Sequence, residues 1–315
     1  MDGSDLAVRG CSRVSEGCGN CYAEKIAARF SDVGKPFHGF ADIGPRAGDA
    51  RWTGKVELLR DKLDEPLSWR KPARVFVNSM SDLFHEKLTD HEIARVFAVM
   101  AQAKRHTFQV LTKRPERALN FFMRVSLVDA PAFLVGATGG TWPLPNVWLG
   151  VSVEDQKTAD ERIPILLQMP AAIRFVSYEP ALGPVEHGRF LTRCRYAATD
   201  HFRCCDAYPH MVVGLDWVIV GGESGPGARP FDIAWARSVV EQCKAAGVAC
   251  FVKQLGARPV HELPGDGPTG QFRSRDGVRE YARTIHTLPL RDRKGGDPSE
   301  WPEDLRVREF PEARA

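Results

Sequence analysis

The sequence predicts an α/β protein in which six or more parallel strands form a partial, TIM-barrel-like (β/α) barrel. Three observations lead to this fold class: short apolar runs recur along the chain, helical patterns separate most of them, and polar residues follow each run. Runs this apolar suit strands that are buried on both faces of a parallel sheet. Their recurrence every roughly 25–45 residues favours a barrel over an open sheet.

The predicted strands are six runs, each ending in polar residues. In chain order they are Arg74–Asn78, Thr107–Thr112, Val147–Ser152, Arg174–Tyr178, Asp216–Val220 and Ala249–Lys253. Strands that alternate with helices form right-handed βαβ units. We therefore assign residues 1–256 to one barrel.

The predicted helices between the strands have apolar residues at helical spacing. They are Asp90–Ala103, Pro115–Arg124, Asp155–Met169 and Asp232–Ala246. Thr89 is a favourable cap for the first helix, proline suits the first turn of the second, and Gly247 ends the fourth.

Three segments interrupt the alternation. Residues 32–73 are irregular and rich in Gly and Pro, with one candidate strand at Lys55–Leu59, and residues 183–215 replace a crossover helix. Residues 257–315 are charged and loop-like. We interpret the first two as inserts in the barrel and the third as a C-terminal extension packed on it.

The bulk composition is that of a globular protein in the cytoplasm. Hydrophobic residues make up 43% and charged residues 26% of the chain, and no apolar run approaches the ~18 residues that a membrane span needs. The N-terminus lacks a secretory signature. Eight cysteines in 315 residues are too sparse for a disulfide scaffold. A net charge of +3 is compatible with nucleic-acid binding but does not indicate it.

Three cysteines, Cys11, Cys18 and Cys21, lie within eleven residues in a C-x6-C-x2-C pattern. Three thiolates can hold an iron–sulfur cluster and leave one iron free for a small molecule. A structural zinc site needs a fourth ligand, for which His38 is the nearest candidate. Iron–sulfur is the first interpretation because C-x6-C-x2-C is not a pair of zinc knuckles.

Polar residues at the carboxyl ends of the strands are expected to converge, because barrel active sites lie on that face. They are Asn78, Asp82, Lys113, Glu154, Glu179, Glu223, Lys253 and Gln254. Asp82, Lys113, Glu179 and Lys253 are the candidate catalytic residues. The alternatives are structural ion pairs and the general polarity of loops.

The segment Cys18-Gly-Asn-Cys21-Tyr22 resembles the cluster loop of radical S-adenosylmethionine (SAM) enzymes, although their usual spacing is C-x3-C-x2-C. The chain as a whole resembles the phage Gp37/Gp68 family, which has this three-Cys loop and no assigned reaction. The similarity rests on Val77–His85, Leu111–Arg114, Trp148–Ser152, Ser177–Pro180, Gly221–Gly225, Lys253-Gln254 and Trp301–Arg306.

The radical SAM resemblance implies that a [4Fe-4S] cluster binds Cys11, Cys18 and Cys21, with SAM on the free iron and an external electron donor. It also implies that Gly221, Gly222 and Glu223 hold the methionine amine, although this motif normally follows an early strand. Asn78 and Tyr22 are assigned to cofactor binding as well. A glycine-rich turn or an anion-binding nest is the alternative for residues 221–223.

The resulting first hypothesis is a radical SAM enzyme that modifies a nucleic acid base or a nucleotide. The substrate class rests on the phage-family resemblance and on the arginines and aromatic residues of the 183–215 insert, a composition suited to phosphate contact and base stacking. The second hypothesis is a nucleic-acid-binding protein stabilised by zinc or an iron–sulfur cluster, without catalysis. The third is a hydrolase that uses the strand-end carboxylates.

Overall fold

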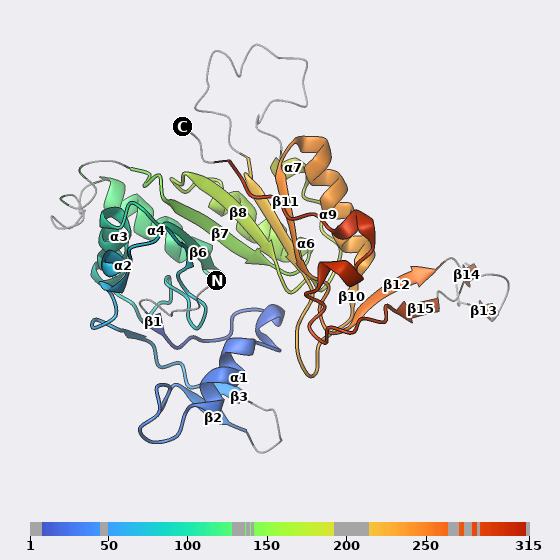
Figure 1. The fold of residues 1–315 in the computed structure, drawn as a ribbon, viewed down its shortest axis with the longest axis horizontal. Helices are drawn as coiled ribbons and strands as arrows, with labels where there is room; N and C mark the ends of the chain where they lie inside the picture. The colour runs from blue at the N-terminus through green and yellow to red at the C-terminus, as the bar shows by residue number, and fades with distance from the viewer. Residues whose placement is uncertain are drawn as a thin grey trace, which may run out of the picture.

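The computed structural model describes residues 8–44, 50–127, 136, 139, 142–191, 214–263, 271–273, 279–281 and 284–312. Its centre is a six-stranded parallel sheet that curls into a half-barrel (Figure 1). The predicted fold class, a partial α/β barrel, is confirmed. Most of the 183–215 insert, with Arg193, Arg195, Arg203, Cys194, Cys204 and Cys205, lies outside the described residues.

The six strands follow the predicted apolar runs closely. In spatial order they are β11 (Ala249–Gln254), β9 (Trp217–Gly221), β8 (Ile173–Tyr178), β7 (Val147–Val153), β6 (Thr107–Thr112) and β5 (Arg74–Phe76). Every neighbouring pair is parallel. All six carboxyl ends therefore lie at one edge of the half-barrel, which we call the mouth.

Helices cover the convex face of the sheet. The crossovers contain α3 (Asp90–Gln102), α4 (Pro115–Leu127), α6 (Gln156–Leu166) and α9 (Ile233–Ala246). Thr89 caps α3 in a capping box with Glu92, and Gly247 ends α9 in the left-handed conformation. The sequence therefore encodes these helix ends locally.

Alternation along each strand separates the two faces of the sheet. On β7, Val147, Leu149 and Val151 belong to the large core under the helices, whereas Trp148 belongs to a separate aromatic cluster. That cluster lies on the concave face and includes Ile173, Phe175 and Trp217, with Phe251 packed against it. The concave face is therefore filled with rings at the end opposite the mouth.

The C-terminal tail closes this opposite end. The backbone at Val252 and Cys250 of β11 bonds to Val307 and Glu309 of the tail. The Phe310 ring then packs 5.2 Å from the Trp217 ring, and the Arg74 guanidinium of β5 lies 3.7 Å over Phe310. Since β11 and β5 are opposite edges of the sheet, the tail spans the open side of the half-barrel.

An N-terminal segment lies beside the mouth (Figure 1). Its elements are β1 (Val8–Arg9), η1 (Glu16–Cys18), α1 (Tyr22–Arg29), β2 (Ala41–Ile43), β3 (Ala50–Trp52) and β4 (Glu57–Leu58). Strand β4 matches the candidate strand at Lys55–Leu59 and pairs with β1. α1 packs on the β2–β3 hairpin through a small core that includes Ala27 and Phe40. The short α2 (Glu65–Ser68) leads into β5.

Regular structure occurs in the last sixty residues, which the sequence suggested were loop-like. β10 (Phe231–Asp232), β12 (Pro259–Leu263) and β15 (Thr284–Thr287) form a three-stranded sheet, and β13 (Gln271–Arg273) pairs with β14 (Arg279–Tyr281). Two short 3-10 turns follow, η3 (Pro298–Glu300) and η4 (Glu303–Leu305). Trp301 between them is buried in the main core. Within the described residues, no helix has the length and apolar character to cross a bilayer.

Candidate metal and cofactor site

The cysteine loop, residues 11–21, lies across the mouth of the half-barrel. It leaves β1 through Gly10, which forms a parallel bridge with Ser81 just beyond β5. The loop then passes through η1 and enters α1 directly after Cys21. The chain leading into the cysteines therefore pairs with the segment just beyond the carboxyl end of β5, which brings the thiols to the edge where active sites of such folds lie.

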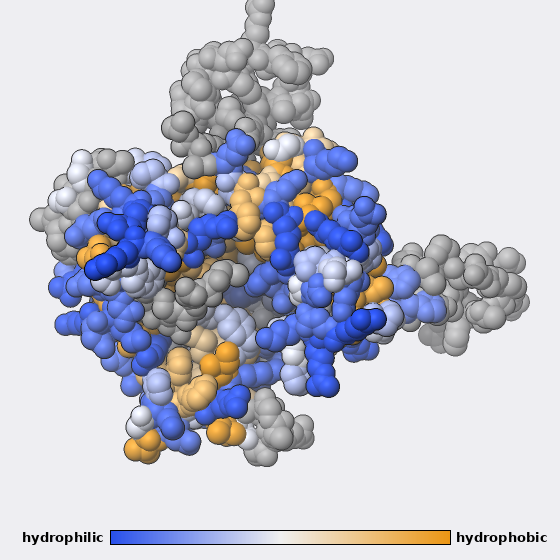
Figure 2. Space-filling model, in the orientation of Figure 1, coloured by the Kyte–Doolittle hydropathy of each residue, from blue (hydrophilic) through white to orange (hydrophobic). Residues whose placement is uncertain are grey.

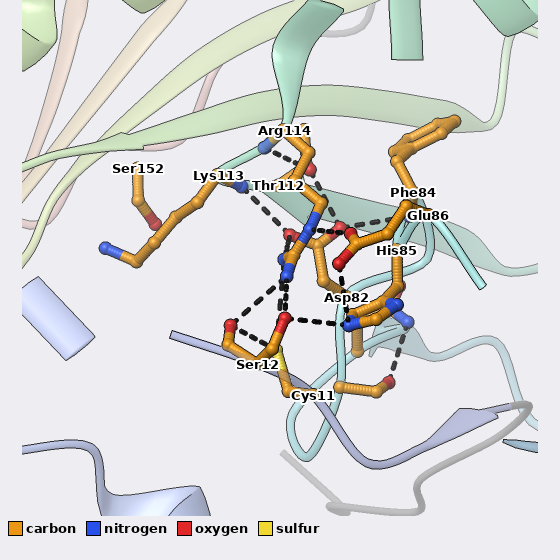
Figure 3. Close-up of polar contacts among 12 residues, drawn as sticks. Cys11, Ser12, Asp82, Phe84, His85, Glu86, Thr112, Lys113, Arg114 and Ser152 are labelled. Atoms are coloured by element: carbon orange, nitrogen blue, oxygen red, sulfur yellow. Dashed lines mark hydrogen bonds and ion pairs between the residues drawn. The ribbon is translucent and has the colours of Figure 1, made fainter. Parts of the chain in front are cut away.

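Arg114, just beyond β6, fastens the beginning of the loop. Its Nη2 donates to the Ser12 carbonyl (3.1 Å) and Oγ (2.8 Å), and its Nη1 lies 3.9 Å from Cys11 Sγ. Its Nε donates to Glu86 at 2.9 Å. Figure 3 shows the guanidinium between the carboxylates of Asp82 and Glu86 on one side and Ser12 on the other.

Asp82 holds Arg114 in place. Its carboxylate accepts from the Phe84 amide (3.0 Å), the Thr112 hydroxyl (2.8 Å), the Lys113 amide (3.1 Å) and Arg114 (3.1 Å). With four donors and 5% exposure, this carboxylate is a positioning group. His85, the last residue of the Val77–His85 motif, contacts Ser12 Oγ through Nε2 at 2.9 Å. Its Nδ1 accepts from the Lys87 amide, so Nε2 donates.

Glu154, directly after β7, holds the middle of the loop. Its carboxylate accepts from Ser15 Oγ at 2.9 Å, from Lys113 Nζ and from Arg162 Nη1 at 3.1 Å. Burial alone raises the pKa of Glu154, but Lys113 and Arg162 outweigh it and hold the pKa below its usual range. A Cβ at Gly17 would collide with the Glu154 side chain, so the loop approaches this carboxylate closely only because Gly17 lacks one.

Glu223, just after β9, holds the end of the loop. Asn20 Nδ2 donates to its Oε2 at 3.3 Å, and Arg229 binds both oxygens, at 2.5 and 3.2 Å. Burial raises its pKa, but the Arg229 hydrogen bonds reverse this and lower it. A Cβ at Gly222 would stand 2.7 Å from the Leu255 carbonyl, so packing between strand ends is sufficient to require this glycine.

The remaining predicted site residues form further contacts at the mouth. Lys253 Nζ and Gln254 Nε2 donate to the Glu179 carboxylate at 2.8 and 3.2 Å. Tyr22, half exposed, donates its hydroxyl to the Ser79 carbonyl at 2.7 Å. Asn78 donates to Ser81 Oγ at 3.0 Å, but its Oδ1 is buried without a partner among the described residues. That oxygen can accept a hydrogen bond from a ligand.

The three thiols are free and half-buried. Cys18 and Cys21 lie in one turn of the backbone, in which the Cys21 amide donates to the Cys18 carbonyl. Cys11 instead lies against Arg114. Burial, with the charge of Asp82, raises the pKa of Cys11 to about 12, and burial raises that of Cys21. Across the described residues, no three or more His, Cys, Asp or Glu side chains are gathered as a metal site, and His38 is exposed.

Three sulfur donors in one loop at the mouth fit an iron–sulfur cluster chemically, and a bound cluster has to draw Cys11 toward Cys18 and Cys21. Metal binding lowers the pKa of its ligand thiols because the metal selects the thiolate. Cys11, Cys18 and Cys21 are the residues that would hold the cluster. Arg13 and Arg114 beside the loop would offset part of its negative charge.

The strand-end carboxylates are poorly suited to act as the general acid of a hydrolase. A general acid needs a pKa raised toward neutrality, yet the pKa values of Glu154 and Glu223 are lowered by their cations. Asp82 and Glu179 are each paired with a cation as well. A cavity of about 500 Å³ lies elsewhere, lined by Val56–Asp61, Lys87, Leu88 and Glu92, and contains no predicted site residue.

Sequence reasoning did not single out the residues that anchor the loop. These are Asn20, Arg114, Arg162 and Arg229, whereas Ser12 and Ser15 are small polar residues of the kind that suit a loop wrapped around a cluster. The one usable signal was the position of Arg114 directly after the strand-end residue Lys113. Arg162 and Arg229 carried no signal because each faces a carboxylate across a turn whose shape the sequence does not reveal.

Comparisons with known proteins show the family and leave the reaction open. Neither the curated proteins nor the solved structures include a match to this chain. A family model described as a protein of unknown function, DUF5131, matches residues 5–286. The match covers the cysteine loop and all six strands of the half-barrel. The chain therefore belongs to the DUF5131 family.

Proposed function

We propose that this protein is an iron–sulfur, SAM-dependent radical enzyme that acts on a nucleic acid or a nucleotide. The observation that carries the proposal is the placement of the three-cysteine loop across the mouth of a six-stranded parallel half-barrel. The resemblance of the loop to that of radical SAM enzymes supports the reaction class, and the resemblance of the chain to the phage Gp37/Gp68 family supports the substrate class.

The protein's own contribution is to fix the loop at three points. Arg114 holds Ser12, Glu154 holds Ser15, and Glu223 holds Asn20. The three anchors follow different strands, so the loop cannot shift as a unit without breaking contacts to all of them. When bound, the cluster and SAM supply one-electron reduction and abstraction of a hydrogen atom from the substrate, while the fold orients them and excludes water.

Two groups at the mouth offer contacts to SAM. The buried Asn78 Oδ1 can accept from an N–H donor, and an unsatisfied acceptor of this kind costs about 1–3 kcal/mol until a ligand pairs with it. The Glu179–Lys253 pair presents a carboxylate and an amine to the ammonium and carboxylate of an amino acid. The assignment of Glu223 to the methionine amine stays a prediction, and it requires displacement of Arg229 or Asn20.

The test is SAM cleavage by the reconstituted protein. The full chain is loaded anaerobically with iron and sulfide and reduced with dithionite in the presence of SAM, and 5′-deoxyadenosine is measured by chromatography. We expect this product from the wild type and from Cys243→Ala, which changes a core cysteine remote from the loop. We expect none from Cys18→Ala. An intact cluster without 5′-deoxyadenosine would contradict the proposal.

A further inference from the structure

The exposed side of α1 carries a set of large apolar and basic side chains, which we call the stacking face. It consists of Tyr22, Lys25, Ile26, Arg29 and Phe30. The exposed fractions are 51% for Tyr22, 41% for Ile26 and 43% for Phe30. Arg29 lies with its guanidinium 5.9 Å from the centre of the Phe30 ring.

The stacking face is free of carboxylates because the one acid of the helix, Glu24, points the other way. Glu24 is 1% exposed and is bound by Arg13 and by the Trp52 amide. The other buried positions are alanines packed on the β2–β3 hairpin. The helix therefore presents cations and large apolar groups together, with no negative charge of its own.

Exposed apolar side chains are concentrated in this part of the molecule. Among the described residues, nine large apolar side chains are exposed, and six of them lie between residues 14 and 43. Figure 2 shows hydrophobic surface over the N-terminal segment, next to hydrophilic surface. Such a concentration on one segment indicates a binding surface rather than scattered exposure.

The stacking face begins at the cysteine loop. Tyr22 follows Cys21 directly and bonds to Ser79 beyond β5, while Lys25 donates to Asn20 of the loop and to the Pro226 carbonyl. From there the helix runs away from the mouth to Phe30 (Figure 1). A flexible chain lying on this face would have one end at the candidate site.

We propose that the stacking face binds single-stranded nucleic acid and leads it to the mouth. Aromatic side chains interleaved with cations suit a strand whose bases are free to stack and whose phosphates need neutralising. A duplex hides its bases, and an acidic protein offers charge without stacking. That the bound single-stranded nucleic acid is also the substrate rests on the proposed function, but the binding itself does not.

The experiment measures binding by full-length protein without cluster or SAM, using fluorescence anisotropy of a labelled twelve-nucleotide oligo-dT. Phe30→Leu keeps an apolar side chain but removes the ring, and we expect about tenfold weaker binding. Phe30→Trp keeps a ring and should bind within about twofold of the wild type. Arg29→Gln should reduce the slope of log Kd against log salt by about 0.7.

The matched control is the double substitution Met123→Leu and Arg124→Gln on α4, where an apolar and a basic side chain are also exposed. We expect it to leave binding unchanged. Equal affinity of Phe30→Leu and Phe30→Trp would overturn the proposal, as would equally tight binding of a duplex or of poly-glutamate. The absence of 5′-deoxyadenosine in the separate cluster assay would contradict only the radical reaction.

Discussion

The two ends of the half-barrel are closed in opposite ways. At the end away from the mouth, Trp217 packs among Trp148, Phe175, Phe251 and Phe310, with ring centres 5.2 to 6.0 Å apart. At the mouth, the predicted catalytic carboxylates Asp82 and Glu179 are paired with cations, and the loop that covers this end is fastened by the ion-paired residues Arg114, Glu154 and Glu223.

The difference separates stability from function. Burial of aromatic rings stabilises the fold directly. In a buried ion pair, the free energy needed to desolvate the two charges offsets much of their attraction. A chain that needed only stability could fill both ends with rings. The polar end is therefore where the protein holds groups for chemistry, as is usual for the carboxyl ends of barrel strands.

The largest effect is expected from Trp217→Ala at the aromatic end. Trp217 is 3% exposed and its Nε1 donates to the Glu309 carbonyl, so the substitution removes ring packing and a tail contact together. We expect a loss of about 3–5 kcal/mol in the free energy of unfolding, measured by urea denaturation. Cys18→Ala in cluster-free protein should lose less than about 1 kcal/mol. Equal losses would remove the distinction between the two ends.

The next largest effect is expected from Glu154→Gln at the mouth. The carboxylate is 1% exposed, and its loss leaves Lys113 and Arg162 buried without their counter-charge. We expect a loss of about 3 kcal/mol and faster amide exchange in residues 11–21. Glu161→Gln removes an exposed pair with Lys157 and should cost less than about 0.5 kcal/mol. Unchanged exchange in the loop would show that Glu154 does not hold it.

Acid should affect two buried histidines, His187 beside Tyr178 and His85 at the mouth, before the carboxylates of the mouth, because burial lowers the pKa of both. Burial lowers the pKa of His187 to about 4, only partly offset by the backbone at Val185, so the unfolded chain takes up a proton first. Stability should be full above pH 6.5 and fall by up to about 3 kcal/mol near pH 4. Because the pKa values of Glu154 and Glu223 are lowered in the folded protein, the stability that these carboxylates contribute is lost only below about pH 4.5.

The measurement for this prediction is urea denaturation at pH 7 and pH 5. His187→Gln should reduce the difference in stability between the two pH values, because glutamine does not titrate, and should leave the part that comes from His85. A variant that keeps the wild-type difference would mean that other groups titrate in this range.

The smallest effect is expected from Phe310→Ala in the tail. Phe310 is 40% exposed but contacts Trp217 and Phe251 at 5.2 Å and lies under Arg74. We expect a loss of about 1–2 kcal/mol by thermal or urea unfolding. Val33→Ala, at an apolar position that is 86% exposed, should be neutral. No loss in Phe310→Ala would show that the tail does not help close the half-barrel.

The sequence was sufficient for the half-barrel because its signals are local. Each strand is an apolar run, and the caps at Thr89 and Gly247 mark helix ends within a few residues. The gathering of polar residues at one edge follows from parallel topology alone. The contact of Phe310 with Arg74 could not be predicted, since the two residues lie 236 positions apart in the sequence (310 − 74) and no periodicity connects them.

The structure brings together polar side chains that the sequence places at the strand ends, but most of their pairings could not be predicted. Which cation meets Glu154 or Glu223 depends on turns whose geometry the residue types do not encode, so Arg162 and Arg229 appeared only in the structure. Likewise, the spacing of Cys11, Cys18 and Cys21 indicates a common ligand, whereas the position of Cys11 against Arg114 depends on a contact between β6 and a distant loop.

The most direct test of the central claim is Mössbauer and visible spectroscopy of the anaerobically reconstituted protein. The account predicts a [4Fe-4S] cluster absorbing broadly near ~400 nm in the wild type and in Cys243→Ala. It predicts loss of the cluster in Cys11→Ala, Cys18→Ala and Cys21→Ala. A colourless protein that binds one zinc ion, or a cluster that survives replacement of all three loop cysteines, would contradict it.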